Sequence, residues 1–146
     1  FGALGALATG VAIGVQSALS SRTGALIGDL RTGLMTNLIG GSIAGVLVVM
    51  FILFQGKSSM QLPAKAGIML AIAGALGIAI ITGVAFSLQR TGVAAGLAII
   101  ILGQLVVSVI VDTRGMGGVE PIPLSVQRVA GLLVMAVAVF LLMPRE

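Results

Sequence analysis

The sequence contains no cysteine and no histidine. Without cysteine there are no disulfide bonds and no thiolate metal sites, and without histidine the commonest metal ligand and proton carrier is missing. The sequence also lacks a nucleophile–base pair, a cluster of metal ligands and a phosphate-binding loop of the GxxxxGK[ST] type. It therefore predicts a protein that is not an enzyme and that holds no cofactor or metal.

Charged residues are scarce, and Trp and Tyr are absent. Only 8% of the 146 residues are charged and 58% are hydrophobic, whereas soluble domains carry about 25% charged residues. This composition predicts an integral membrane protein. The net charge of +4 does not indicate nucleic acid, because the cations lie between apolar runs, where they contact lipid headgroups. Without Trp or Tyr, a strong aromatic cage for quaternary amines is not expected.

Five apolar runs follow one another along the chain. A membrane core of about 30 Å needs roughly 20 helical residues, and the runs lack the alternation of strands. We expect an all-α integral membrane protein with one domain over 1–146 and five transmembrane helices. Their expected ranges are 1–20, 33–54, 66–86, 92–111 and 125–143.

The expected connections are 21–32, 55–65, 87–91 and 112–127. The last is expected to be extended, because Pro121 and Pro123 do not fit inside a helix. Arg128 is expected to reach the interface from the start of the fifth span. The alternative for the first run is a signal peptide, but its length and glycine spacing favour a retained span. Because the sequence begins at Phe1 rather than Met, further N-terminal residues are expected.

Lys and Arg are divided evenly between the two sides of the predicted membrane. One side holds Arg22, Arg31, Arg90 and Arg145, and the other holds Lys57, Lys65, Arg114 and Arg128. Since orientation is set by Lys and Arg in short loops, this balance favours dual topology over one fixed topology. Five spans place the termini on opposite sides. The sequence thus predicts an antiparallel homodimer, a ten-helix bundle with inverted repeats; a heterodimer with a homologous chain is the alternative.

Polar residues inside the spans are the candidate site. Gln104, Ser108 and Asp112 are spaced by four, which places them on one helix face. The spacing predicts a substrate pathway ending in a carboxylate; hydrogen bonding between helices is the alternative. Gln16 and Asn37 are further pathway candidates, and Gln16 could face Gln104 within one chain or across a dimer.

Asp112 and Arg128 are the candidates for coupling or gating. The alternative for Asp112 is an interfacial ion pair with Arg114 or Arg128. The hydroxyl groups of Ser20, Thr36, Ser42 and Thr82 are expected to donate hydrogen bonds to backbone carbonyls of their own helices.

Small residues let helices approach closely in lipid. GxxxG spacing gives the helix-packing candidates Gly10, Gly14, Gly41, Gly45, Gly92 and Gly96, and it also occurs at Gly24 and Gly28.

Several motifs resemble those of a known family. They are Gly103-Gln104-Leu105 with Ser108 and Asp112, a Gly-rich turn, Pro123-Leu124-Ser125, Arg128 with Gly131, Gln16, the segment 73–77 and the segment 91–94. Together they resemble the YdcZ-like family of the drug/metabolite transporter superfamily. The resemblance implies about five helices per domain, with domains single, paired or fused, and a location in the bacterial inner membrane. The family often has Asn after the first-helix Gln, where this chain has Ser20 and Ser21.

The favoured function is a secondary carrier of a small neutral, zwitterionic or amphipathic solute, working by alternating access. The alternatives are a passive pore of dual topology and a structural membrane subunit that does not transport. The expected partners are a second copy or a homologous chain, membrane lipids and a small-molecule substrate. No nucleic-acid partner is expected.

Overall fold

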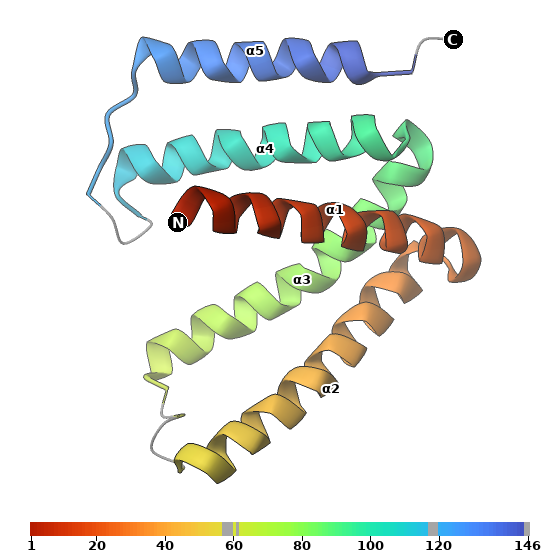
Figure 1. Ribbon diagram of the computed structural model, residues 1–146, viewed down its shortest axis with the longest axis vertical. Coiled ribbons are helices and arrows are strands. Elements are labelled where there is room, and N and C mark those ends of the chain that lie inside the picture. The colour runs from red at the N-terminus through yellow and green to blue at the C-terminus, as the bar shows by residue number, and fades with distance from the viewer. Residues whose placement is uncertain (57–59, 61, 117–119, 145–146) are drawn as a thin grey trace. The chain divides into compact units, whose positions relative to one another are not determined.

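The computed structural model describes residues 1–56, 60, 62–116 and 120–144, and in these residues all regular structure is helical. The helices are α1 Gly2–Ile27, α2 Asp29–Gln55, α3 Ala64–Thr91, α4 Val93–Arg114 and α5 Val126–Leu142 (Figure 1). The expected all-helical architecture is confirmed for this part of the chain. Lys57 and Arg145 of the cation count lie outside the described residues.

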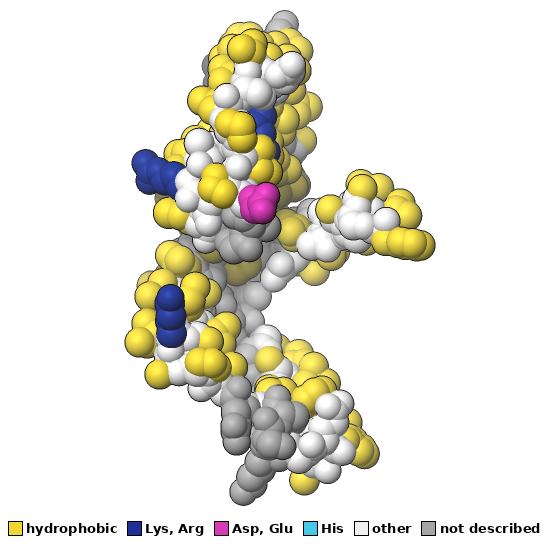
Figure 2. Space-filling view, turned by 90° about the vertical axis from the view of Figure 1, so that its left-hand side faces the viewer, with side chains coloured by type: hydrophobic (Ala, Val, Ile, Leu, Met, Phe, Trp, Pro, Cys, Tyr) yellow, Lys and Arg dark blue, Asp and Glu magenta, His cyan; other side chains and the backbone are white. Residues whose placement is uncertain are grey.

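The helices have the length and surface of membrane spans. The four helices α1 to α4 are long and apolar enough to cross a membrane, whereas α5 is an apolar helix of 17 residues. Large hydrophobic side chains are exposed along them, with Leu53 at 77% and Phe54 at 83%. The face seen in Figure 2 is largely hydrophobic, with few charged side chains. In water such a surface would cause aggregation, so it indicates a lipid environment.

The helices α1 to α4 are longer than the apolar runs that predicted them, whereas α5 is one residue shorter at each end than the expected range 125–143. The expected connection 21–32 is helical except at Gly28, and the expected turn 87–91 is the last part of α3. These expectations were wrong because hydropathy marks the part of a helix that lies in hydrocarbon, not the place where the helix ends. Polar residues such as Arg22 and Arg31 continue the helical backbone beyond the apolar run.

Glycines with positive φ end or separate the helices. Gly28 alone joins α1 to α2, with a φ of 90°, and Gly92 alone joins α3 to α4. Gly115 adopts the left-handed conformation after α4, where its N–H donates to the carbonyl of Asp112 and the N–H of Met116 donates to that of Val111. This pair of bonds is a Schellman motif, which satisfies carbonyls at the helix end.

The chain divides into two compact units, Phe1–Gln89 and Arg90–Glu146, which are described separately. In the first unit, small residues let helices meet. A side chain at Gly33 would collide with the Thr82 hydroxyl and lie 2.8 Å from the carbonyl oxygen of Ile78. A side chain at Gly24 would lie 3.0 Å from Ala85. The α2–α3 contact therefore requires glycine at position 33.

The second unit is an antiparallel pair, with α4 and α5 lying side by side (Figure 1). Its buried residues are mostly small: Ala95, Gly96 and Ala98 on α4, with Val139 on α5. Small side chains permit close packing of two helices without large apolar groups between them.

We expect Gly33→Ala to destabilise the protein by about 1–3 kcal/mol, because the added methyl group forces α2 away from α3. The measurement is thermal unfolding of purified protein in detergent. The matched control is Gly40→Ala on the same helix, where an added Cβ has no neighbour within 4 Å. This control should unfold at the wild-type temperature or slightly above it. Equal shifts for the two variants would contradict the described α2–α3 contact.

Candidate functional site

A polar stripe follows one face of α4. Gln104, Ser108 and Asp112 all lie within this helix, one turn apart. At 1.5 Å per residue the stripe covers about 12 Å, and Gln104 lies about 15 Å from the helix end at Arg114. Since the membrane core is about 30 Å thick, Gln104 lies near half depth when α4 crosses the membrane. The stripe thus connects the middle of the helix to its carboxyl end.

The two inner members of the stripe are exposed and unpaired. Gln104 and Ser108 are exposed on α4, and neither side chain has a hydrogen-bond partner among the described residues. An amide in hydrocarbon without a partner costs several kcal/mol. The described part of the chain therefore leaves these groups in need of another protein surface, water or a substrate.

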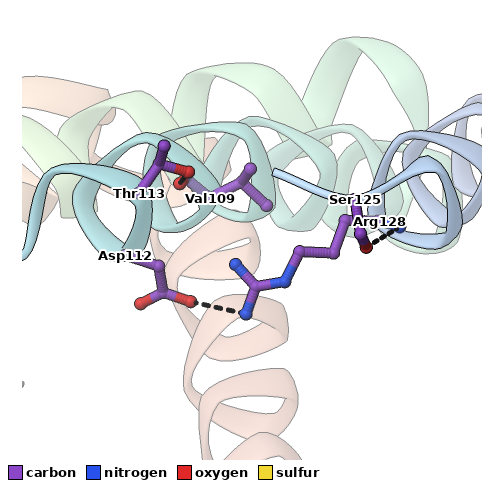
Figure 3. Close-up of polar contacts among 5 residues, drawn as sticks. All are labelled: Val109, Asp112, Thr113, Ser125 and Arg128. Atoms are coloured by element: carbon purple, nitrogen blue, oxygen red, sulfur yellow. Dashed lines mark hydrogen bonds and ion pairs between the residues drawn. The ribbon is translucent and has the colours of Figure 1, made fainter. Parts of the chain in front are cut away.

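At the outer end of the stripe, Asp112 of α4 forms an ion pair with Arg128 of α5. The Nη2 atom of Arg128 lies 3.2 Å from Oδ2 of Asp112, as Figure 3 shows. The side chains are 28% and 35% exposed, respectively. Arg128 Nη1 is buried and has no hydrogen-bond partner in the described residues. Of the two arginines considered as partners for Asp112, the structure pairs it with Arg128.

Local structure positions this pair. The Ser125 side chain caps α5 by accepting a hydrogen bond from the backbone N–H of Arg128, which fixes the first turn of the helix. The backbone N–H of Ile122 donates to the carbonyl of Asp112 at 3.0 Å. Ile122, in the described segment 120–125, is thus held at the end of α4, and Arg128 lies within reach of Asp112.

Gln16 and Asn37 lie in the first unit. Gln16 is exposed on α1, whereas Asn37 is half-buried, donates to the carbonyl of Gly33 and lies next to Gly77. A side chain at Gly77 would approach Asn37 Oδ1 to 2.9 Å, so the amide lies at the α2–α3 contact. The expected contact between Gln16 and Gln104 stays a prediction, because these residues belong to different units.

Three of the four hydroxyl groups that were expected to bond back do so. Ser20, Ser42 and Thr82 each donate to the carbonyl four residues earlier, at 2.8–2.9 Å. These groups are satisfied within their own helices, so they need no partner in lipid.

The six helix-packing candidates have three different kinds of surroundings. An added side chain at Gly10, Gly14, Gly41 or Gly45 would have no neighbour within 4 Å, whereas Gly96 is buried. Gly92 forms the turn between α3 and α4. The first four glycines therefore lie on open helix surface, where a second chain or lipid can approach.

Sequence reasoning missed a groove between α2 and α3. It has a volume of about 560 Å³, and it is lined by Asp29, Leu30, Ala75, Ile78, Ala79, Thr82, Gly83 and Phe86. Next to it, the Gln89 side chain donates a hydrogen bond to Asp29, 60 residues away in the sequence. Hydropathy carries no information about such long-range pairing, so no pattern indicated this contact.

Comparison of the chain with known protein families supports the family resemblance of the motifs that lie on α4 and around the start of α5. The family model described as "Putative inner membrane exporter, YdcZ" matches residues 1–141, which confirms the resemblance. No curated protein and no solved structure matches the chain. The apolar helices and this match together indicate a multi-pass protein of the inner membrane. The chain therefore belongs to the YdcZ family of membrane transporters.

Proposed function

We propose that the protein is a secondary carrier that works by alternating access and is built from two antiparallel copies. The observation that carries this proposal is the exposure of Gln104 and Ser108 on α4 without hydrogen-bond partners in the described residues. Polar groups at membrane depth occur where they contact protein or line a water-filled path. A dimer interface with a substrate path at its centre provides both.

The depth of Gln104 favours a two-fold axis in the membrane plane. Such an axis exchanges the two membrane faces but keeps the middle of each α4 at the same depth. The Gln104 side chains of both copies can then contribute to one site, which matches the position of substrate sites in transporters with inverted repeats. The balanced Lys and Arg distribution supports insertion in both orientations.

In the proposed dimer α5 is a fifth span, although it is shorter than the other four helices. Its 17 residues correspond to about 25 Å, at the lower limit for a span. Residues 120–125 come before α5 and are not helical. They can span the part of the membrane thickness that α5 leaves, at the interface. In this arrangement each chain contributes five helices.

The Asp112–Arg128 pair is the proposed gate. Because the copies are inverted, one pair lies near each membrane face, and opening one pair at a time gives alternating access. A partly exposed ion pair contributes only about 1 kcal/mol or less, so it can open and close readily. The buried Nη1 of Arg128 supplies a further donor for a passing solute.

The substrate class follows from the side chains along the path. The charged residues of the described helices lie near the helix ends, whereas amide and hydroxyl groups occupy the middle of α4. Amides both donate and accept hydrogen bonds, and they do not neutralise a net charge. We therefore propose a small neutral, zwitterionic or amphipathic solute.

The pathway can be tested without knowing the substrate. Because the sequence has no cysteine, a single introduced cysteine is the only thiol. We expect Gln104→Cys and Ser108→Cys to react with a membrane-impermeant thiol reagent in reconstituted vesicles. Val106→Cys, an exposed apolar position on the opposite face of the same helix, should remain unreactive. If positions 104 and 108 are as unreactive as 106, the stripe faces lipid or dry protein and the pathway assignment fails.

The gate makes a second prediction in the same system. We expect Asp112→Asn to accelerate labelling of the Ser108→Cys thiol by up to about fivefold, since the lost pair contributes about 1 kcal/mol or less. Asp112→Glu, which keeps the charge, should label at the original rate. Asp29→Asn is the control for charge loss outside the stripe. An unchanged rate with Asp112→Asn would show that the pair does not limit access.

Orientation is tested with cysteines on opposite sides of α2. Leu26 lies just before the turn at Gly28, and Leu62 lies between α2 and α3; both are exposed. With dual topology, roughly half of each thiol should be labelled from outside sealed vesicles. Complete labelling at one position and none at the other would exclude the antiparallel homodimer, while the transporter family assignment would stand.

A further inference from the structure

A narrow groove lies at the carboxyl end of α4, on a different part of the helix surface from the polar stripe. It has a volume of about 230 Å³ and is lined by Val109, Ile110, Thr113, Arg114 and Leu124. The first four residues belong to α4, and Leu124 comes from the segment before α5. Val109 and Arg114 are five residues apart, so the groove follows the helix over about 7 Å.

The chemistry of the groove is apolar with a cation at one end. Val109, Ile110 and Leu124 are hydrocarbon side chains, and Arg114 is the single charged lining residue. The Thr113 hydroxyl donates to the carbonyl of Val109 at 2.7 Å, an arrangement visible in Figure 3. Because this hydroxyl proton is used inside the helix, the guanidinium group of Arg114 is the main donor available to a ligand.

The two arginines at this end of the α4–α5 pair have different electrostatic partners. Arg128 is neutralised by Asp112 at 3.2 Å, whereas Arg114 makes no ion pair with any residue that the structure describes. Arg114 is exposed and is the last residue of α4. The last residue of a membrane-crossing helix lies at headgroup level, where anionic lipids supply phosphate groups.

We propose that this groove binds an anionic phospholipid, with its phosphate on the Arg114 guanidinium and the upper part of one acyl chain along Val109, Ile110 and Leu124. A guanidinium group matches phosphate oxygens with two parallel N–H donors. The apolar walls extend from the charged end toward the membrane interior, which is the order of groups along a phospholipid. This inference requires a membrane-embedded chain, and it does not depend on the proposed transport mechanism.

The absence of tryptophan allows a direct test. In the variant Leu124→Trp the groove carries the only indole, and bromine atoms on a nearby acyl chain quench its fluorescence. The protein is reconstituted in phosphatidylcholine vesicles containing the same small fraction of either dibrominated phosphatidylglycerol or dibrominated phosphatidylcholine. We expect phosphatidylglycerol to be enriched about fivefold over phosphatidylcholine at this position, which corresponds to about 1 kcal/mol for one cation at the surface.

Matched variants distinguish lipid binding in the groove from attraction of anionic lipids by the overall positive charge of the protein. Adding Arg114→Gln should remove the enrichment, whereas Arg114→Lys should retain most of it. Arg31→Gln, which removes an exposed cation from α2, should leave it unchanged. In Val107→Trp, which reports on exposed α4 surface outside the groove, both lipids should quench equally.

Four results would overturn the proposal. Equal quenching by the two lipids at position 124 would mean that the groove does not select an anionic headgroup. Enrichment that survives Arg114→Gln would assign it to the overall charge of the chain. Absence of quenching at 124, with normal quenching at 107, would mean that a second copy covers the groove. Loss of the enrichment on adding inorganic phosphate would identify a site for free anions rather than for lipid.

Discussion

The rule that polar groups in hydrocarbon must find hydrogen-bond partners determines this structure. It makes every described span a helix, since a helix satisfies its backbone internally. It also accounts for the hydroxyl groups of Ser20, Ser42 and Thr82, each of which donates to a carbonyl in its own helix. Against this background Gln104 and Ser108 stand out, because they are exposed on α4 without a partner in the described chain. These two side chains are the groups in the middle of α4 for which the described chain leaves this requirement unmet.

The same requirement explains why the membrane class and the polar stripe were predictable from sequence. Apolar length indicates a span, and a spacing of four places Gln104, Ser108 and Asp112 on one face of any regular helix. The helix ends were less predictable. Hydropathy changes where the membrane ends, whereas the helices continue to Gly28 and Gly92, which break them through their backbone conformation.

Contacts between helices were the least predictable part. GxxxG spacing selected Gly10, Gly14, Gly41 and Gly45, which lie on open surface, and it did not select Gly33, the glycine that packs against Thr82. A spacing rule describes one helix, whereas packing depends on which side chains of the neighbouring helix lie opposite each glycine. The Asp29–Gln89 hydrogen bond is another example, since it joins residues 60 positions apart. The open glycines remain suited to contacts with a second chain or with lipid.

The single-glycine turns at Gly28 and Gly92 have a consequence for the water-facing parts of the protein. When all five helices cross, both turns lie on one side of the membrane, and the longer connections 56–63 and 115–125 lie on the other. One copy therefore places most of its extramembrane backbone on a single face. In the proposed antiparallel dimer, two inverted copies would expose a similar amount of backbone to both compartments, so a soluble partner approaching from either side would meet nearly the same surface.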